Sequence, residues 1–165
     1  MQFWGRMASG MLFMCEGHIF LQLRSADVEE SGVWGIPGGA LEGGWYQFQT
    51  RPNGIEPPTL TDDDIQDLWD SAVRETEEEV GYFPSNYRIL DTVINWVKNT
   101  NFPYVTFILD IPVEEKEAII ASVREVEESG QWESEANDWF PGNELPQDVH
   151  HGVEYVLDKW KSKQT

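Results

Sequence analysis

The sequence predicts the α/β fold class, because two kinds of apolar pattern are interspersed along it. Short apolar runs bounded by turn residues are typical of strands, and apolar residues spaced three and four apart are typical of helices. The strand-like runs lie near residues 7–15, 18–24, 87–97 and 103–111. The helical patterns cover residues 62–80, 114–128 and a C-terminal segment from Val153 to Trp160. A chain of 165 residues is long enough for one domain with a buried core.

The first two runs predict a pair of strands that turn at Glu16 and Gly17. The single cysteine, Cys15, lies in the first run, and we interpret it as a small buried residue of a protein in a reducing compartment. A loop through Pro37, Gly38 and Gly39 follows the second run, since proline and glycine interrupt regular structure.

An amphipathic helix is predicted from about residue 62 to about residue 80. Thr61 followed by Asp64 is a capping signal at its start, and Gly81 followed by Pro84 is a stop signal. Apolar or small residues form one stripe along this helix, at Ile65, Leu68, Trp69, Ala72, Thr76 and Val80. The stripe predicts that the helix packs on the core.

Glutamates are crowded at the end of this helix. At ~100° per residue, Arg74 and Glu77 are expected to point away from the stripe, whereas Glu75, Glu78 and Glu79 lie beside it. Three carboxylates spaced i, i+3 and i+4 repel one another, and partial burial adds a desolvation cost. A hard divalent ion such as Mg²⁺, which shares its coordination sphere with water and substrate phosphates, would relieve both. A solvated acidic face is the alternative interpretation.

The segment RETEEEVGY, residues 74–82, resembles the second half of the Nudix box. WGIPGGALEGG, residues 34–44, resembles the loop that opens the box, and ASGMLF, IFLQLRS and DWFPGNELP resemble the family's first strands and closing segment. The chain is therefore identified as a member of the Nudix hydrolase family. The resemblance implies a Nudix-like α/β/α sandwich with a central mixed β-sheet, as a single domain over residues 1–165. It also implies Mg²⁺-assisted attack of water on a diphosphate linkage.

The box departs from the family pattern by an insertion. Trp45 stands where the family has glutamate, and 28 residues, 46–73, separate it from Arg74 where the family has seven. Counting back from Arg74 instead places Gln66 at the glutamate position, which predicts weaker support for the arginine. The added segment, about residues 45–64, is expected to form an ordered loop or short hairpin. It is either a surface elaboration or a wall over the substrate, with Arg51 reaching phosphate and aromatic residues stacking on a base, namely Trp45, Tyr46 or Phe48.

The resemblance assigns a role to individual residues. The expected metal ligands are the Gly39 carbonyl and the carboxylates of Glu75, Glu78 and Glu79, with Glu42 joining through water. Arg74 would orient the glutamates. Arg74 and Glu78 are the catalytic residues that the resemblance implies within the box. A general base from outside the box is expected at Glu135 or, second, at Glu133, against the alternative of a solvated loop acid. The expected substrate-binding residues are Arg24, Trp34, Arg51 and Lys98.

The net charge of −19 argues against DNA or RNA as a general ligand, because binding a phosphate backbone uses clustered Lys and Arg and only 11 are scattered here. We recognise no signal peptide and no apolar run near the ~20 residues that a membrane span needs, so we expect a cytoplasmic protein without a membrane partner. His150 and His151 are interpreted as a helix-end pair, since no third metal ligand has suitable spacing.

Two classes of function fit these observations. The first is a hydrolase, dependent on Mg²⁺ or else Mn²⁺, that cleaves the diphosphate linkage of a nucleoside diphosphate joined to another moiety. Its partner would be a small nucleotide-type molecule, and a homodimer is left open. The second is a non-catalytic module of the same fold that binds a nucleotide or a protein. The carboxylate cluster favours the enzyme, because a binding module has no need of that repulsion.

Overall fold

The computed structural model describes residues 2–5, 7–24, 32–41, 46–49, 59–96, 103–130 and 134–164. Its strands are β1 (Gln2–Gly5), β2 (Ala8–Cys15), β3 (His18–Arg24), β4 (Trp34–Gly35), β5 (Gly38–Ala40), β6 (Tyr46–Gln49), β7 (Arg88–Trp96), β8 (Pro103–Asp110) and β9 (Ser134–Pro141). Its helices are α1 (Asp62–Val80), α2 (Val113–Ser129) and α3 (His151–Ser162). The predicted α/β class is confirmed, as are the predicted strands now labelled β2, β3, β7 and β8 and the three predicted helices.

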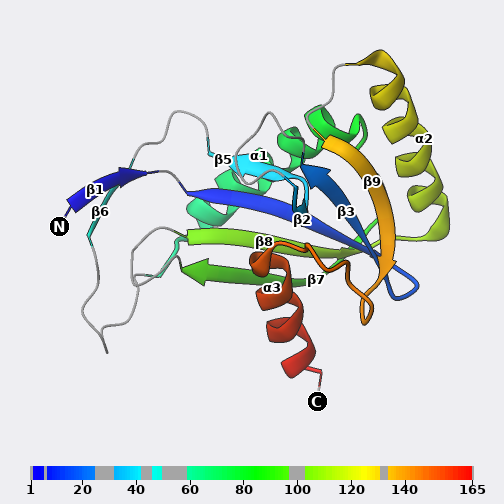
Figure 1. Ribbon diagram of the computed structural model, residues 1–165. Helices are drawn as coiled ribbons and strands as arrows, with labels where there is room; N and C mark the ends of the chain where they lie inside the picture. Colours follow the sequence, from blue (N-terminus) through cyan, green and yellow to red (C-terminus); the bar gives the residue numbers. More distant parts are fainter. Residues whose placement is uncertain are drawn as a thin grey trace.

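The central sheet has seven strands and is mixed, because β2 runs parallel to β8 while the other pairings are antiparallel. Its order is β4-β3-β2-β8-β7, with β5 also paired to β2 and β9 also paired to β3. β2 and β3 pair at Met14–Ile19 and Cys15–His18, beside their turn, and then diverge (Figure 1). We name the two sides of this fork the β2 limb (β5, β2, β8 and β7) and the β3 limb (β4, β3 and β9).

Helices cover both faces of the sheet, which gives the predicted α/β/α layers. One core cluster packs the sheet against α1 and α2 and includes Phe13 and Leu68. A second cluster packs the opposite face against α3 and includes Leu12 and Leu157. Figure 1 shows α1 and α3 on opposite sides of the sheet. Within the described ranges, no helix is long and apolar enough to cross a membrane.

Cys15 is buried in the cluster under α1 and α2, as predicted. Burial raises the pKa of its thiol. Because the thiolate is the reactive form, this side chain is an inert core residue.

The ends of α1 follow from its capping residues. Thr61 accepts a hydrogen bond from the Asp64 backbone N–H at 3.1 Å, and Asp64 accepts one from the Thr61 backbone N–H at 3.0 Å. This reciprocal pair satisfies two backbone donors that the helix itself leaves without partners. At the other end, Gly81 adopts the left-handed conformation with φ 84°, and its N–H donates to the Glu77 carbonyl.

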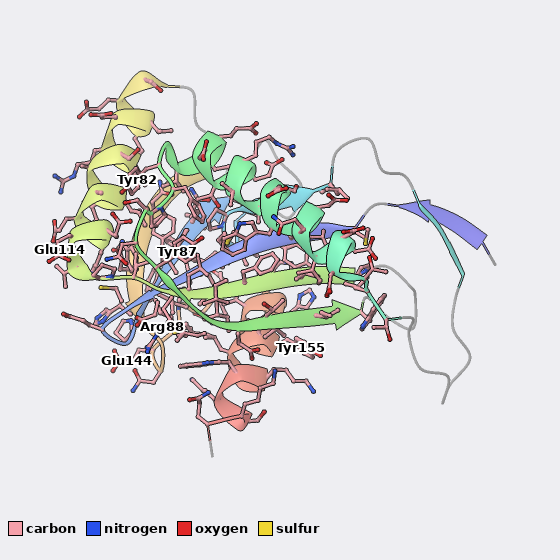
Figure 2. The ribbon with its side chains drawn as sticks, turned by 180° about the vertical axis from the view of Figure 1, so that it is seen from behind. Tyr82, Tyr87, Arg88, Glu114, Glu144 and Tyr155 are labelled. Atoms are coloured by element: carbon pink, nitrogen blue, oxygen red, sulfur yellow. The ribbon has the colours of Figure 1, made fainter. Side chains whose placement is uncertain are left out.

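A buried carboxylate fastens the segment after α1 to α2. Glu115, in the first turn of α2, accepts hydrogen bonds from the Tyr82 hydroxyl at 2.7 Å and from the Asn86 backbone N–H at 2.9 Å. Burial acts to raise the pKa of Glu115, but the hydrogen bonds outweigh it and leave this pKa below its ordinary value. The same bond raises the pKa of Tyr82, which lies between α1 and α2 (Figure 2).

Two strands that were not predicted from the sequence bear on the site, and the first of them was expected to be a loop. β5 (Gly38–Ala40) consists of small residues, so it has no alternating pattern to detect. β9 (Ser134–Pro141) places Trp139 against the core under α1 and α2 and Phe140 against the core under α3. Because both faces of β9 are covered, apolar and polar residues do not alternate cleanly along it.

We predict that Glu115→Gln lowers the free energy of unfolding at pH 7 by about 1–3 kcal/mol, because charged hydrogen bonds to a buried group are lost. The folded pKa is depressed, so this stability is present above the unfolded pKa, near 4.5, and is lost as pH falls through the folded pKa. Urea denaturation of both proteins at pH 7 and below pH 4.5 measures the difference. The exposed neighbour Glu114, changed to Gln, is the control. A gap between wild type and Glu115→Gln that does not shrink in acid would contradict this account.

Candidate active site

The glycine strand β5 lies beside α1 because both are attached to β2. Gly38 and Gly39 pair with Gly10 and Ser9 of β2. Ser9 is fully buried, and its hydroxyl donates a 2.6 Å hydrogen bond to the Leu68 carbonyl of α1. Both α1 and β5 are therefore attached to the same strand, β2.

Gly39 faces the carboxyl group of Glu75. A β-carbon built on Gly39 would lie 2.9 Å from Glu75 Cδ and within 3.2 Å of both carboxylate oxygens. The Glu75 side chain is only 20% exposed, so this approach takes place in a partly buried space. Next along the strand, the Gly38 backbone N–H donates to Glu79 Oε1 at 3.4 Å. The glycines thus let the backbone come directly against two of the three predicted metal-ligating carboxylates.

Arg74 contacts the carboxylates of Glu75 and Glu78. Its Nη2 donates to Glu75 Oε1 at 3.3 Å, and its Nε is 3.7 Å from Glu78 Oε1. These contacts are the ones that an orienting role requires. Arg74 was expected to point away from the stripe, but its side chain is only 38% exposed, because a long guanidinium arm can reach back along the helix.

Glu78 is more exposed than the sequence analysis expected. Its side chain is 60% exposed, whereas Glu75 and Glu79 are half-buried. Glu77 is exposed, as predicted. The difference arises because Glu75 and Glu79 are one helical turn apart and both meet β5, while Glu78 lies beside them facing water and Arg74.

The donor types fit Mg²⁺, since carboxylate oxygens and a backbone carbonyl are ligands that hard cations prefer. In the described part of the chain, no group of three or more His, Cys, Asp or Glu side chains is gathered closely enough to hold a metal ion. Like-charge repulsion keeps carboxylates apart unless a cation lies between them. The residues that would hold the ion are neighbours on α1 and β5. Their carboxylate groups do not point to one common position.

Glu135, the first choice for a general base, lies in strand β9 and not in the loop that the alternative interpretation assumed. Leu23 of β3 pairs with Ala136, but Arg24 pairs with Ser134, so Glu135 is the extra residue of a β-bulge in β9. A bulge redirects side chains and is common beside active sites. Arg24 therefore lies next to this bulge, at the end of β3. Glu133 lies outside the described residues.

The other predicted positions divide into those the structure describes and those it does not. Trp34, in β4, packs its ring edge-on against Phe140 with centroids 4.9 Å apart, so its ring belongs to the core under α3. Gln66 donates to Asp70 at 3.0 Å rather than supporting Arg74. His150 accepts the Gly152 N–H at the start of α3, which confirms the helix-end interpretation. Outside the described residues lie Glu42, Trp45, Arg51 and Lys98, and only the backbone is described for Tyr46 and Phe48.

Ser9 contributes to the site but was not predicted from the sequence. Its signal was available, because a serine within the apolar run ASGMLF must find a hydrogen-bond partner if the strand is buried. The partner is a helix carbonyl 59 residues away, which no local pattern indicates.

A NUDIX domain family model matches residues 5–160 of the chain. Among curated proteins, no relative matches it. Solved structures are similar in fold: the MutT NUDIX hydrolase from Burkholderia pseudomallei is 22% identical, with 93% of this chain and 95% of that chain covered and a TM-score of 0.52. A C. elegans Ap4A hydrolase is 12% identical, with 95% of this chain and 97% of that chain covered and a TM-score of 0.53. The NUDIX domain of Shewanella oneidensis NrtR, solved with ADP ribose, is 12% identical, with 98% of this chain and 90% of that chain covered and a TM-score of 0.50.

We predict that Gly39→Ala displaces the Glu75 carboxylate and abolishes most of the rise in melting temperature that Mg²⁺ or Mn²⁺ causes, while the metal-free protein still folds. The reason is that the new methyl group meets the flexible end of a side chain and not backbone. Thermal unfolding with and without each ion is the measurement. Gly35→Ala is the matched control, since a β-carbon there meets nothing within 4 Å. An undiminished metal shift in Gly39→Ala would remove Gly39 from the ion site.

Proposed function

The chain belongs to the NUDIX domain family and is a pyrophosphohydrolase of the Nudix type. We propose that it cleaves the diphosphate linkage of a nucleoside diphosphate joined to another moiety. We propose Mg²⁺ or Mn²⁺ as its cofactor. The observation that carries the proposal is the contact of the glycine strand with α1, where Gly39 faces Glu75 and Gly38 donates to Glu79. We further propose that residues 1–165 act as one domain in the cytoplasm.

The proposed reaction divides the work among a few residues. The Gly39 carbonyl, Glu75, Glu78 and Glu79 would hold the ion, which when bound neutralises phosphate oxygens and lowers the pKa of a bound water. Arg74 holds Glu75 and Glu78 in place. The oxygen of water bonds to one phosphorus, the bridging oxygen leaves with the other phosphate and the bonding electron pair, and the carboxylate of Glu135 takes the proton of the water.

A small nucleotide fits the charge of the chain better than capped or long RNA does. Tracking an RNA backbone needs several basic contacts, and a chain of net charge −19 with 11 basic residues offers few near the site. Arg24 lies next to the bulge that contains Glu135, where it could meet one diphosphate group. Two of the structurally similar proteins are named for, or were solved with, such nucleotides: Ap4A and ADP ribose. These two, a nucleotide sugar and capped RNA form the substrate panel.

We predict that Glu78→Gln and Glu79→Gln each lower kcat by roughly 10²-fold or more, because each removes charge that stabilises the transition state. Both variants should fold, and metal-free protein should be as stable as wild type or slightly more so, since repulsion within the cluster is relieved. Steady-state kinetics on the panel, with and without Mg²⁺, measure the effect.

Glu77→Gln is the control for this experiment, because it removes the same charge from the exposed face of the same helix. Near-normal kcat in Glu78→Gln and Glu79→Gln, or an equal loss in Glu77→Gln, would exclude the cluster from the mechanism. If the wild type binds a panel nucleotide by calorimetry and hydrolyses none of them, the non-catalytic binding module is the better account.

The insertion is proposed to shape substrate recognition. Replacing residues 50–58 by a glycine-serine linker of equal length, or changing Arg51 to Gln, is expected to raise KM severalfold or to broaden specificity. The metal-induced rise in melting temperature should persist, because Glu75, Glu78 and Glu79 lie on the helix that follows. Kinetics on the panel that match wild type would show that the insertion has no part in recognition, and preference for capped RNA would overturn the argument from charge.

A further inference from the structure

A tyrosine side chain reaches the glycine strand from the face of the sheet opposite α1. Tyr104 is half-buried on β8, where it pairs in register with Ala8 of β2. A β-carbon built on Gly10 would lie 2.5 Å from the Tyr104 hydroxyl oxygen, and one built on Gly38 would lie 2.9 Å from it. The side chain therefore crosses β2 at Gly10 and ends at Gly38 of β5.

Alternation along the strands defines the two faces. Val105 and Phe107 of β8 belong to the core under α1 and α2, so Tyr104 points to the other face. On β5, Gly39 faces Glu75 of α1 while Gly38 faces the Tyr104 hydroxyl. The strands β5, β2 and β8 lie side by side (Figure 1). The glycine strand is thus held between carboxylates on one face and a phenol on the other.

The fit depends on two missing side chains. Gly38 packs so closely that a β-carbon there would lie 2.7 Å from the α-carbon of Gly10. A methyl group on either glycine would also occupy the space of the hydroxyl. Because close-packed interiors transmit small displacements, the hydroxyl sets how near β5 can settle to β2 and hence where Gly39 lies relative to Glu75.

We propose that Tyr104 is a positioning residue that fixes Gly38 and Gly39 against the carboxylates of α1. The inference rests on the proposed function, in which the Gly39 carbonyl helps to hold the divalent ion. Tyr104 touches neither substrate nor ion in this role. It acts through the backbone of β5.

The test compares Tyr104→Phe with Tyr155→Phe. Tyr155, on α3, packs against the core on this same face of the sheet, and its ring centroid lies 5.6 Å from the Lys159 ammonium nitrogen (Figure 2). Tyr104→Phe removes one oxygen and keeps the ring, so the metal-free protein should melt within a few degrees of wild type. We expect kcat to fall about tenfold at fixed Mg²⁺, with KM nearly unchanged, because a small misplacement of catalytic groups costs rate more than binding. The Mg²⁺ concentration for half-maximal activity should rise severalfold, and Tyr155→Phe should behave as wild type.

A second readout does not use activity. The rise in melting temperature caused by Mn²⁺ or Mg²⁺ without substrate should be smaller in Tyr104→Phe than in wild type and normal in Tyr155→Phe. Wild-type kcat, metal dependence and metal-induced stabilisation in Tyr104→Phe would overturn the inference, as would equal losses in Tyr155→Phe. If the wild type hydrolyses nothing in the panel, the proposed function fails, whereas the melting shifts still decide the role of Tyr104.

Discussion

The close approach of β5 to β2 is the constraint on which the site depends. Gly38 and Gly39 can pair with Gly10 and Ser9 beneath α1 because three of these four residues have no β-carbon. Ser9 supplies the one polar side chain, and its bond to the Leu68 carbonyl fixes the helix over the same strand. The position of the carboxylates relative to the glycine backbone is therefore a result of β-sheet register, not of loop conformation. Register is among the most rigid relationships in a fold, because a slip by one residue reverses every side chain.

Much of this arrangement could be predicted from local sequence. The limits of α1 follow from the capping pair and the terminal glycine, and its buried face follows from the spacing of Leu68, Ala72 and Thr76. The carboxylate run on this helix indicates the candidate site from the sequence alone, without the sheet topology. Such features are readable because their physical causes act over one or two helical turns.

What the sequence analysis missed has causes that act between distant segments. Glycine strand β5 carries no pattern of its own, and it is a strand because Ser9 and Gly10 pair with it. The strand that contains Glu135 was not predicted because the covered faces of β9 obscure alternation, and its bulge depends on pairing with Arg24, far away in sequence. The exposure of Glu78 and the half-buried position of Arg74 depend on side-chain reach, which helical geometry alone does not give.

The forked sheet divides the residues of the proposed chemistry between its two arms, the β2 limb and the β3 limb. The β2 limb carries the glycine strand, and the β3 limb carries Glu135, while β2 and β3 are paired at two positions beside their turn. Beyond that joint, side chains of both arms pack into shared core clusters, with Phe13 of β2 and Phe20 of β3 in one and Leu12 of β2 and Leu21 of β3 in the other. Side-chain volume, more than backbone hydrogen bonding, therefore sets the spacing between the backbone at Glu135 and the glycine strand. Substitutions among these packed core side chains could therefore change the reaction rate over evolution while every reacting group stays the same.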